Sequence, residues 1–332
     1  MKKAIKEYLV KHGFGQLAPK AVLFDMDGVL LDSMSNHAKA WVEAMATYGI
    51  DMTEADAYAT EGQRGIDTIR YMVKEQQGRD LSMAEAQAMY DTKAQAYSKL
   101  PEAEIMPGVK ELMKRMKKDG MKIIVVTGSG QLPLIERLTR DFHGYVTKEN
   151  IITAYDVKHG KPDPEPYLIG LEKAGNLQPW EAIVVENAPL GVRAGNAAEI
   201  FTVAVNTGPL PDSALSDEGA DIVFPDMDTF SKAWKRSFHV TYPQDEMWEN
   251  GYNAIMHYMM TNKRLPSKHH AEDMQMVNWI KYNKKNFARG KMTAERAEKF
   301  QILLDTAKRF RRLNQYTYLN SGMEEELFKE KE

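Results

Sequence analysis

The sequence predicts an α/β fold, in which a doubly wound parallel sheet carries an α-helical cap insert and is followed by a three-helix domain. Short apolar runs alternate with helical patterns, as in parallel sheets that are covered by helices on both faces. A long stretch after the first apolar run has no strand pattern, which predicts the insert. The last third of the chain changes to a basic, helical pattern, which predicts the separate domain.

Five apolar runs rich in β-branched residues predict the strands of the sheet. They are Ala21–Phe24, Ile123–Val126, Ile183–Val185, Phe201–Val205 and, more weakly, Ile222–Phe224. Helical patterns lie between them at Val109–Lys117, Leu132–Arg140, Pro164–Lys173 and Leu190–Ala198. Because the runs are short and continuous, we expect strands that are buried on both faces.

The stretch between His37 and Leu100 predicts the cap. It is rich in Ala, Met, Glu and Gln, and it reads as helices at Ala38–Tyr48, Ile66–Gln77 and Met83–Lys99. We expect this insert to lie over the carboxyl ends of the strands, where open α/β sheets bind their ligands. The predicted catalytic core is therefore 1–36 with 102–237, and the predicted cap is 37–101.

The C-terminal part predicts a basic helical domain at 243–315 and an acidic tail at 316–332. Residues 246–315 hold 14 Lys/Arg against 7 Asp/Glu, with helical patterns at Glu246–Thr261, Ala271–Asn286 and Thr293–Phe310. A basic surface with aromatic residues can bind nucleic acid. Helices of this kind are more often solvated bundles, so we rank nucleic-acid binding below self-association or docking on the acidic catalytic part.

Composition excludes several classes of protein. With 43% hydrophobic and 27% charged residues in 332, the chain is typical of soluble globular proteins. The absence of cysteine excludes disulfides and thiolate metal sites. No run approaches the ~18 apolar residues of a membrane span, and the first ten residues lack the apolar segment of a secretory signal. We expect a cytoplasmic protein with no membrane partner.

Two acids follow the first predicted strand. Asp25 and Asp27 come two residues apart, directly after Phe24, and Gly28 allows the chain to turn just past them. In extended backbone, residues i and i+2 point the same way, so both carboxylates are expected to face one site. Such a pair allows one acid to attack or bind metal while the other exchanges a proton.

Further polar residues follow the second and third core strands. Thr127, Gly128 and Ser129 come at the end of the IIVV run, where a hydroxyl and free backbone N–H groups predict a phosphate seat, although they also suit a simple helix cap. Lys161, placed before a proline in GKPDPEPY, offers a cation for phosphoryl oxygens. Glu186 and Asn187 follow in VVENAPLG, after the third core strand.

These motifs, in this order, closely resemble the four motifs of the haloacid dehalogenase (HAD) superfamily. The resemblance covers roughly 20–237 and implies a Rossmann-like core. The cap resembles that of the branch with β-phosphoglucomutases and small phosphatases. The resemblance to the superfamily implies that Asp25 forms an aspartyl-phosphate, that Asp27 is the general acid and base, and that Thr127 and Lys161 hold the phosphoryl group. It also implies Mg²⁺ on Asp25, on the backbone carbonyl of Asp27 and on the Glu186–Asn187 motif.

The fourth motif departs from the family pattern, because members commonly have an aspartate at the position of Asn187. We expect Glu61, in the cap loop TEGQRGIDT, to reach the site and supply the missing charge as a metal or substrate ligand. The alternative is a solvated surface acid. Arg64 in the same loop is a further candidate phosphate ligand. His37 is another, in a helix that resembles the first cap helix of the branch.

The cap loop and VVENAPLG together resemble a subgroup that includes HAD-type inorganic pyrophosphatases. The expected function is therefore that of a Mg²⁺-dependent phosphohydrolase acting on a small phosphate substrate, with pyrophosphate as the first prediction. The alternatives are a sugar-phosphate phosphatase or a β-phosphoglucomutase, and, as another class, binding through the C-terminal part. That part also weakly resembles the helicase-associated helical domain.

Overall fold

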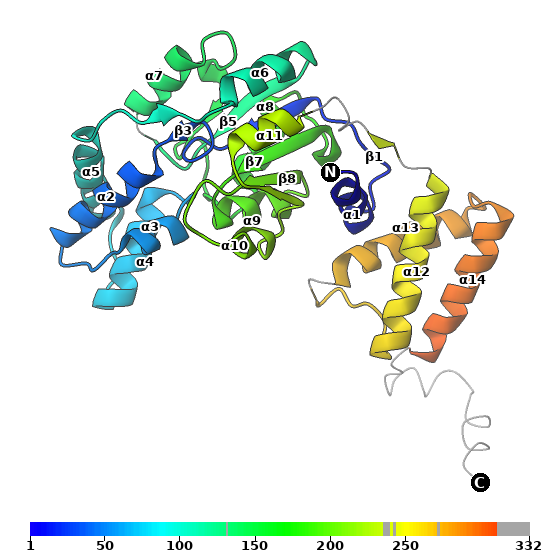
Figure 1. Ribbon diagram of the computed structural model, residues 1–332. Helices are drawn as coiled ribbons and strands as arrows, with labels where there is room; N and C mark the ends of the chain where they lie inside the picture. The colour runs from blue at the N-terminus through cyan, green and yellow to red at the C-terminus, as the bar shows by residue number, and fades with distance from the viewer. Residues whose placement is uncertain (131, 235–239, 242–243, 271–272, 311–332) are drawn as a thin grey trace. The chain divides into compact units, whose positions relative to one another are not determined.

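The computed structural model describes residues 1–130, 132–234, 240–241, 244–270 and 273–310 (Figure 1). By their contacts the residues fall into two compact units, one of Met1–Leu9 with Gln16–Thr241 and one of Val10–Gly15 with Tyr242–Glu332. The predicted cap and the predicted core lie within the first unit, apart from Val10–Gly15 of the core. The predicted acidic tail, 316–332, lies outside the described residues.

A six-stranded parallel sheet forms the centre of the first unit, and it confirms the predicted fold class. Its strand order is β6-β5-β2-β7-β8-β9. The strands are β2 (Ala21–Phe24), β5 (Lys122–Val126), β6 (Ile151–Ile152), β7 (Ala182–Glu186), β8 (Phe201–Val205) and β9 (Ile222–Phe224). The central strand β2 pairs with β5 and β7 in such register that Phe24 lies beside Val125 and Val185. The carboxyl ends of all three strands therefore meet at one edge.

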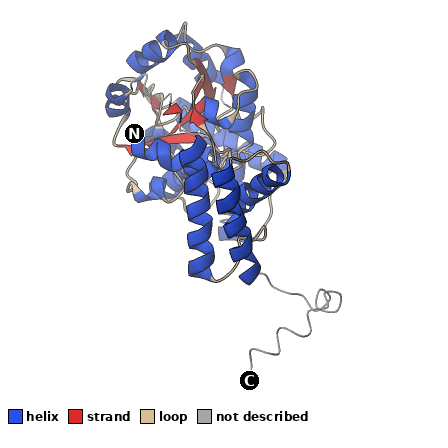
Figure 2. Ribbon diagram, turned by 90° about the vertical axis from the view of Figure 1, so that its right-hand side faces the viewer, coloured by secondary structure: helices blue, strands red, loops and turns tan. Residues whose placement is uncertain are grey.

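Helices cover both faces of this sheet, as Figure 2 shows for the first unit. One face packs against α8 and α9 through alternate strand residues such as Leu23 and Val184. On the other side, α6 lies against β5 and also contacts α11. The helices around the sheet are α1 (Lys2–His12), α6 (Val109–Lys118), α7 (Leu132–Asp141), α8 (Glu165–Lys173), α9 (Pro189–Ala197), α10 (Ser213–Ser216) and α11 (Met227–Ala233). Outside the sheet, β1 (Gln16–Leu17) pairs with β10 (Val240–Thr241).

The cap is helical, as predicted, and it has its own apolar core. It consists of α2 (Met34–Ala46), α3 (Glu54–Ala59), α4 (Gly65–Gln77) and α5 (Met83–Ser98), packed around Trp41, Ile69 and Met89 among others. The short helix α3 was not predicted. Two short antiparallel strands, β3 (Leu31–Asp32) and β4 (Glu104–Ile105), join the two chain crossings between core and cap.

The second unit contains the three C-terminal helices that the pattern predicts. They are α12 (Gln244–Asn262), α13 (Met274–Ala288) and α14 (Ala294–Arg309). Trp248, Trp279 and Phe300 lie in ring contact at their centre, with Ile255, Met259 and Leu303 buried beside them. In the described part of the chain, no helix combines the length and the apolar character that crossing a membrane requires.

Candidate active site

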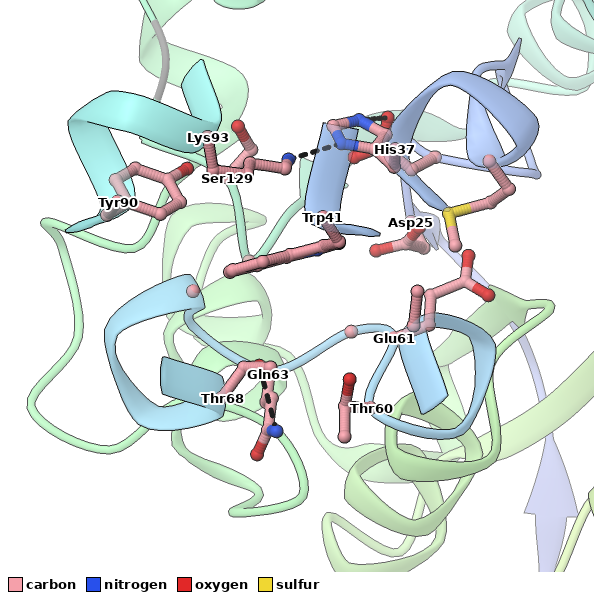
Figure 3. Close-up of a pocket in the computed structure, with 16 residues that line it drawn as sticks. Asp25, His37, Trp41, Thr60, Glu61, Gln63, Thr68, Tyr90, Lys93 and Ser129 are labelled. Carbon is pink, nitrogen blue, oxygen red and sulfur yellow. Dashed lines mark hydrogen bonds and ion pairs between the residues drawn. The ribbon is translucent and has the colours of Figure 1, made fainter. Parts of the chain in front are cut away.

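A cavity at the carboxyl end of β2 contains both predicted acids. Asp25 and Asp27 line a space of about 60 Å³, which cap residues such as Trp41 and Glu61 also line (Figure 3). Gly28 turns the chain at a φ of 77°, and a Cβ atom there would lie 2.0 Å from the side-chain nitrogen of Asn187. The turn therefore requires glycine for two reasons, namely its positive φ and the close approach of Asn187.

Lys161 connects the first acid to the neighbouring strands. Its Nζ atom lies 2.5 Å from Oδ1 of Asp25, 2.6 Å from Oε1 of Glu186 and 3.0 Å from the carbonyl oxygen of Val126. Burial by itself would lower the pKa of Lys161, but the two carboxylates outweigh it and raise the pKa. Burial raises the pKa of Asp25 to about 8; Lys161 opposes that shift, and Glu186 and Asp27 add to it. Lys161 is thus a fixed ammonium group among more acids than it can neutralise.

Glu186 is held behind Lys161 rather than in the cavity. Its Oε1 also accepts a 2.7 Å hydrogen bond from the hydroxyl of Tyr167, and its Oε2 accepts from the backbone N–H groups of Asn187 and Ala188. The side chain is completely buried and is not part of the cavity lining. Both oxygens are occupied, so its geometry suits a residue that positions Lys161. Its role as a metal ligand stays a prediction.

The cap reaches the core through Glu61. Nδ2 of Asn187 donates a 2.7 Å hydrogen bond to Oε1 of Glu61, and both side chains are buried. Burial raises the pKa of Glu61 well above its usual value; the bond from Asn187 opposes this, while Asp25 and Glu186 add to it. Oδ1 of Asn187 is also buried but has no hydrogen-bond partner. Glu61 is therefore not a solvated surface acid, because its buried side chain points into the cavity.

A second network holds Asp27 from the cap side. Oδ1 of Asp27 accepts a 2.5 Å hydrogen bond from Ser33 and lies 3.0 Å from Nε2 of His37. On the far side of the imidazole, Nδ1 of His37 lies 2.6 Å from Nζ of Lys93, and the ring of Tyr97 stacks on His37. Burial raises the pKa of Asp27, but His37 and Ser33 outweigh it and lower the pKa.

The predicted phosphate seat lies under the cap loop. Gly128 and Ser129 line the cavity, and the N–H of Ser129 donates to Oγ1 of Thr127 at 3.0 Å. A Cβ atom on Gly128 would lie 2.6 Å from the carbonyl oxygen of Gly62 and 2.8 Å from that of Gln63. The cap loop therefore rests directly on the backbone of this seat.

Arg64 does not line the cavity that contains Asp25, but it lines a small neighbouring space together with Thr127 and Lys161. Its guanidinium group forms two hydrogen bonds with Asp67, of 2.7 and 3.1 Å. Its side chain packs against Gly160 and lines neighbouring spaces rather than the one that contains Asp25. The remaining predicted residues lie in or directly behind the cavity.

Sequence reasoning missed Lys93, Tyr167 and the aromatic walls Trp41 and Tyr90. Trp41 lies four residues after His37 on α2, so both point to the same side of the helix. Lys93 lies three residues after Tyr90 on the buried face of α5. A lysine on an otherwise apolar helix face was the available signal.

The residues at the cavity fit Mg²⁺. Magnesium prefers oxygen ligands, and the cavity offers carboxylates from Asp25, Asp27 and Glu61. The buried, unpartnered Oδ1 of Asn187 is a further oxygen of the right kind. Burial, together with the neighbouring acids, raises the pKa values of Asp25 and Glu61, and a divalent cation would stabilise their ionised forms.

Comparison with known proteins gives the family. The family model of the haloacid dehalogenase-like hydrolases matches residues 19–199. Hexitol phosphatase A of Escherichia coli is 33% identical over 187 residues, which are 56% of this chain and 83% of that enzyme. A phosphorylated carbohydrates phosphatase of Thermotoga maritima is 30% identical over 203 residues, which are 60% of this chain and 92% of that protein.

A solved structure gives the same result. A candidate beta-phosphoglucomutase from Bacteroides vulgatus is 48% identical and superposes with a TM-score of 0.67, over 70% of this chain and 94% of that one. The family model covers more than half of the chain, but it ends before the C-terminal unit. The resemblance of that unit to the helicase-associated domain therefore stays a prediction. The protein is an enzyme of the haloacid dehalogenase-like hydrolase family, in the branch that contains these phosphatases and β-phosphoglucomutases.

Proposed function

We propose that the protein is a Mg²⁺-dependent phosphatase that transfers the phosphoryl group of its substrate to Asp25 and then to water. The observation that carries this proposal is the placement of Asp25 and Asp27 in one buried cavity, each held by its own network. Asp25 is fixed by Lys161 from the core. Asp27 is fixed by Ser33 and by His37 from the base of the cap.

The two acids take different roles in the proposed reaction. A carboxylate oxygen of Asp25 attacks phosphorus, and the bond to the leaving oxygen breaks. Asp27 gives a proton to that oxygen and later removes one from the water that hydrolyses the aspartyl-phosphate. Lys161 and the seat formed by Thr127, Gly128 and Ser129 neutralise and orient the phosphoryl oxygens, which is where catalysis of this reaction gains most.

Asp25, the carbonyl of Asp27, Asn187 and Glu61 are the residues that would hold Mg²⁺. When bound, the ion supplies positive charge next to the phosphoryl oxygens. Glu186 acts behind this set by keeping Lys161 in place. In this arrangement the cap contributes one ligand, Glu61, so the ligand set is complete only when the cap is closed on the core.

The proposed substrate class is a phosphorylated sugar or polyol. Two relatives, a hexitol phosphatase and a phosphorylated carbohydrates phosphatase, support this class by their names. They favour it over pyrophosphate, which the sequence resemblance put first. We rank hydrolysis above mutase chemistry because the two phosphatases are 33% and 30% identical to this chain, whereas the β-phosphoglucomutase of Bacillus subtilis is 28% identical. The candidate beta-phosphoglucomutase that is 48% identical keeps mutase chemistry as the alternative.

Pyrophosphate stays the second candidate because of the cavity's size. The space of about 60 Å³ has room for only a handful of water molecules, at ~10–15 Å³ each. A hexose phosphate requires more room than this closed arrangement provides. Glu61 at the Asp25 end of the cavity also suits a compact, highly charged substrate that is bound together with a metal ion.

A substrate panel tests the proposal. Phosphate release from hexitol, hexose and glycerol phosphates and from pyrophosphate is measured with Mg²⁺, with Asp25→Asn as the blank. We expect the highest kcat/KM on a sugar or polyol phosphate and loss of activity on chelation of the metal. A preference for pyrophosphate of tenfold or more would select the second candidate. Conversion of β-glucose 1-phosphate to glucose 6-phosphate without phosphate release would select a mutase instead.

A further inference from the structure

Three spaces meet at one side chain of the cap. The catalytic cavity of about 60 Å³ lies on one side, and spaces of about 310 and 640 Å³ lie further out, along α5 and the loop that leads into α7. The two outer spaces share Gln87, Gly130 and Tyr155 and so form one crevice, called here the outer crevice. Tyr90 is the residue that the linings of all three spaces have in common.

The ring of Tyr90 is held in place by close packing. A Cβ atom on Gly65 would lie 2.2 Å from its Cε2 and 2.4 Å from its Cδ2, so this edge of the ring lies directly against the glycine. The indole of Trp41 lies next to it, with 6.5 Å between ring centroids. In Figure 3, Trp41 lies across the cavity, with Asp25 and Glu61 towards one end and Tyr90 at the other.

The outer crevice has the chemistry of a site for a carbon skeleton with hydroxyl groups. Tyr155 and Leu132 line it and expose 71% and 69% of their surface. Gln87 and Gln95 add amide groups on the α5 side. Aromatic faces beside amide groups suit the mixed apolar and hydroxyl surface of a sugar.

We propose that Tyr90 is a specificity-determining residue, which forms the end wall of the catalytic cavity and limits the size of the leaving group. The wall separates the leaving-group end of the cavity from the outer crevice. Removing the ring joins the two spaces, so the part of a larger phosphomonoester that lies beyond its phosphate can extend into the crevice. This proposal rests on the proposed function, because it assumes that Asp25 serves phosphate esters.

The test compares a long with a short phosphomonoester, hexitol 6-phosphate and glycerol 3-phosphate, in wild type, Tyr90→Leu and Tyr90→Phe. Leucine preserves apolar packing in the cap core but shortens the wall, whereas phenylalanine keeps the wall. We expect Tyr90→Leu to raise the ratio of kcat/KM for the long over the short substrate by roughly tenfold, the size of effect that one altered apolar contact gives. Tyr90→Phe should leave the ratio within twofold of wild type.

Tyr71→Leu is the matched control, because Tyr71 belongs to the same cap but is exposed on α4 and lines none of the three spaces. If Tyr90→Leu affects both substrates equally, so that the ratio of their kcat/KM values is unchanged, the proposed role of Tyr90 is wrong. The proposed phosphatase function is not affected by that result. Wild type that hydrolyses neither ester overturns the proposed substrate class instead. In that case the crystal structure of Tyr90→Leu decides: a continuous passage to the outer crevice supports the wall, and a passage closed by other side chains overturns it.

Discussion

The carboxylate of Glu61 and the amide of Asn187 form one functional pair drawn from two parts of the fold. Asn187 stands where related enzymes commonly have an aspartate, and its Nδ2 is bonded to Glu61 at 2.7 Å. Oδ1 of Asn187 is buried and has no hydrogen-bond partner. If this position requires a negative charge, as the sequence resemblance implies, Glu61 of the cap is placed to supply it.

Replacing Glu61 by glutamine tests directly whether the cap supplies this negative charge. Glutamine keeps the size of the side chain and a carbonyl oxygen for Asn187, but it removes the charge that we assign to metal binding. We expect kcat/KM on the best substrate to fall at least tenfold, and the Mg²⁺ concentration for half-maximal activity to rise. Glu54→Gln, an exposed acid on the neighbouring helix α3, is the control and should behave as wild type. Activity of Glu61→Gln within twofold of wild type contradicts the assignment.

The buried lysine of the cap predicts a pH dependence of stability. Burial lowers the pKa of Lys93 from 10.5 to about 8. Between these pH values the unfolded chain binds a proton that the folded protein does not, so the unfolding free energy rises with pH. Over this pH range, the unfolding free energy of the wild type should rise by up to about 3 kcal/mol relative to that of Lys93→Met. Above this range the difference between the two proteins should stay constant. Urea unfolding of both proteins below pH 8 and near pH 10.5 measures the difference; a constant difference contradicts the prediction.

At the level of elements, the contact between the cap loop and the phosphate seat determines how closely the two parts approach. The carbonyl groups of Gly62 and Gln63 lie where a side chain on Gly128 would begin. Backbone atoms cannot turn away as a flexible side chain can. The closed arrangement therefore depends on the absence of a Cβ atom at this one position.

Gly128→Ala should keep the cap loop away from the seat. The overlap with two carbonyl oxygens costs ~1–3 kcal/mol, so we expect kcat/KM to fall by ~10–100-fold while the thermal midpoint changes little. Gly208→Ala is the matched control, because a Cβ atom there would also face the cap but would lie 3.6 Å from the ring of Tyr58, at ordinary contact distance. Equal activity of the two variants would show that this contact does not govern closure.

The strands and most helices were predictable because their residues are buried in a regular pattern. Ala21–Phe24 and Phe201–Val205 are strands with the predicted bounds, since every residue in them is buried. The two-residue strand β6 is too short to give a pattern. Helix α3 does carry a local signal, the capping box between Thr53 and Asp56, which was not recognised because the helix has only six residues.

The site was predictable only in part, because some of its contacts depend on how the helices pack. Asp25, Asp27 and Lys161 follow strands or stand in distinctive short motifs, so parallel strand order brings them together. The contacts of His37 with Lys93, and of Glu186 with Tyr167, depend on how helices pack, which no local pattern encodes. For the same reason Arg64 could be assigned to the right loop, but its pairing with Asp67 could not be predicted.

For the whole molecule, the division into two units separates catalysis from whatever the C-terminal helices do. The family match ends at residue 199, and the two relatives align with 56% and 60% of this chain, which are 83% and 92% of their own lengths. The cavity is lined entirely by residues of the first unit. Nucleic-acid binding by the basic helices stays an untested alternative.

A chain that ends at Thr241 tests the independence of the catalytic part. We expect it to fold cooperatively and to retain kcat/KM within about threefold of the full chain, because no cavity residue is removed. Circular dichroism melting and the substrate panel on both chains provide the comparison. A folded but inactive shorter chain would mean that the second unit contributes to catalysis, which contradicts this division of labour.

The end of β7 places two neighbouring residues in separate networks. Glu186 turns towards Lys161 and Tyr167, while Asn187, the next residue, turns towards the cap. Adjacent residues at the end of a strand point in opposite directions, so inserting or deleting one residue in β7 would turn each of them to the other side. A deletion would bring the amide to the buried lysine, whereas an insertion would bring the carboxylate to Glu61. Substitutions in β7 keep this arrangement of directions, but a change of its length by a single residue would disrupt both networks at once.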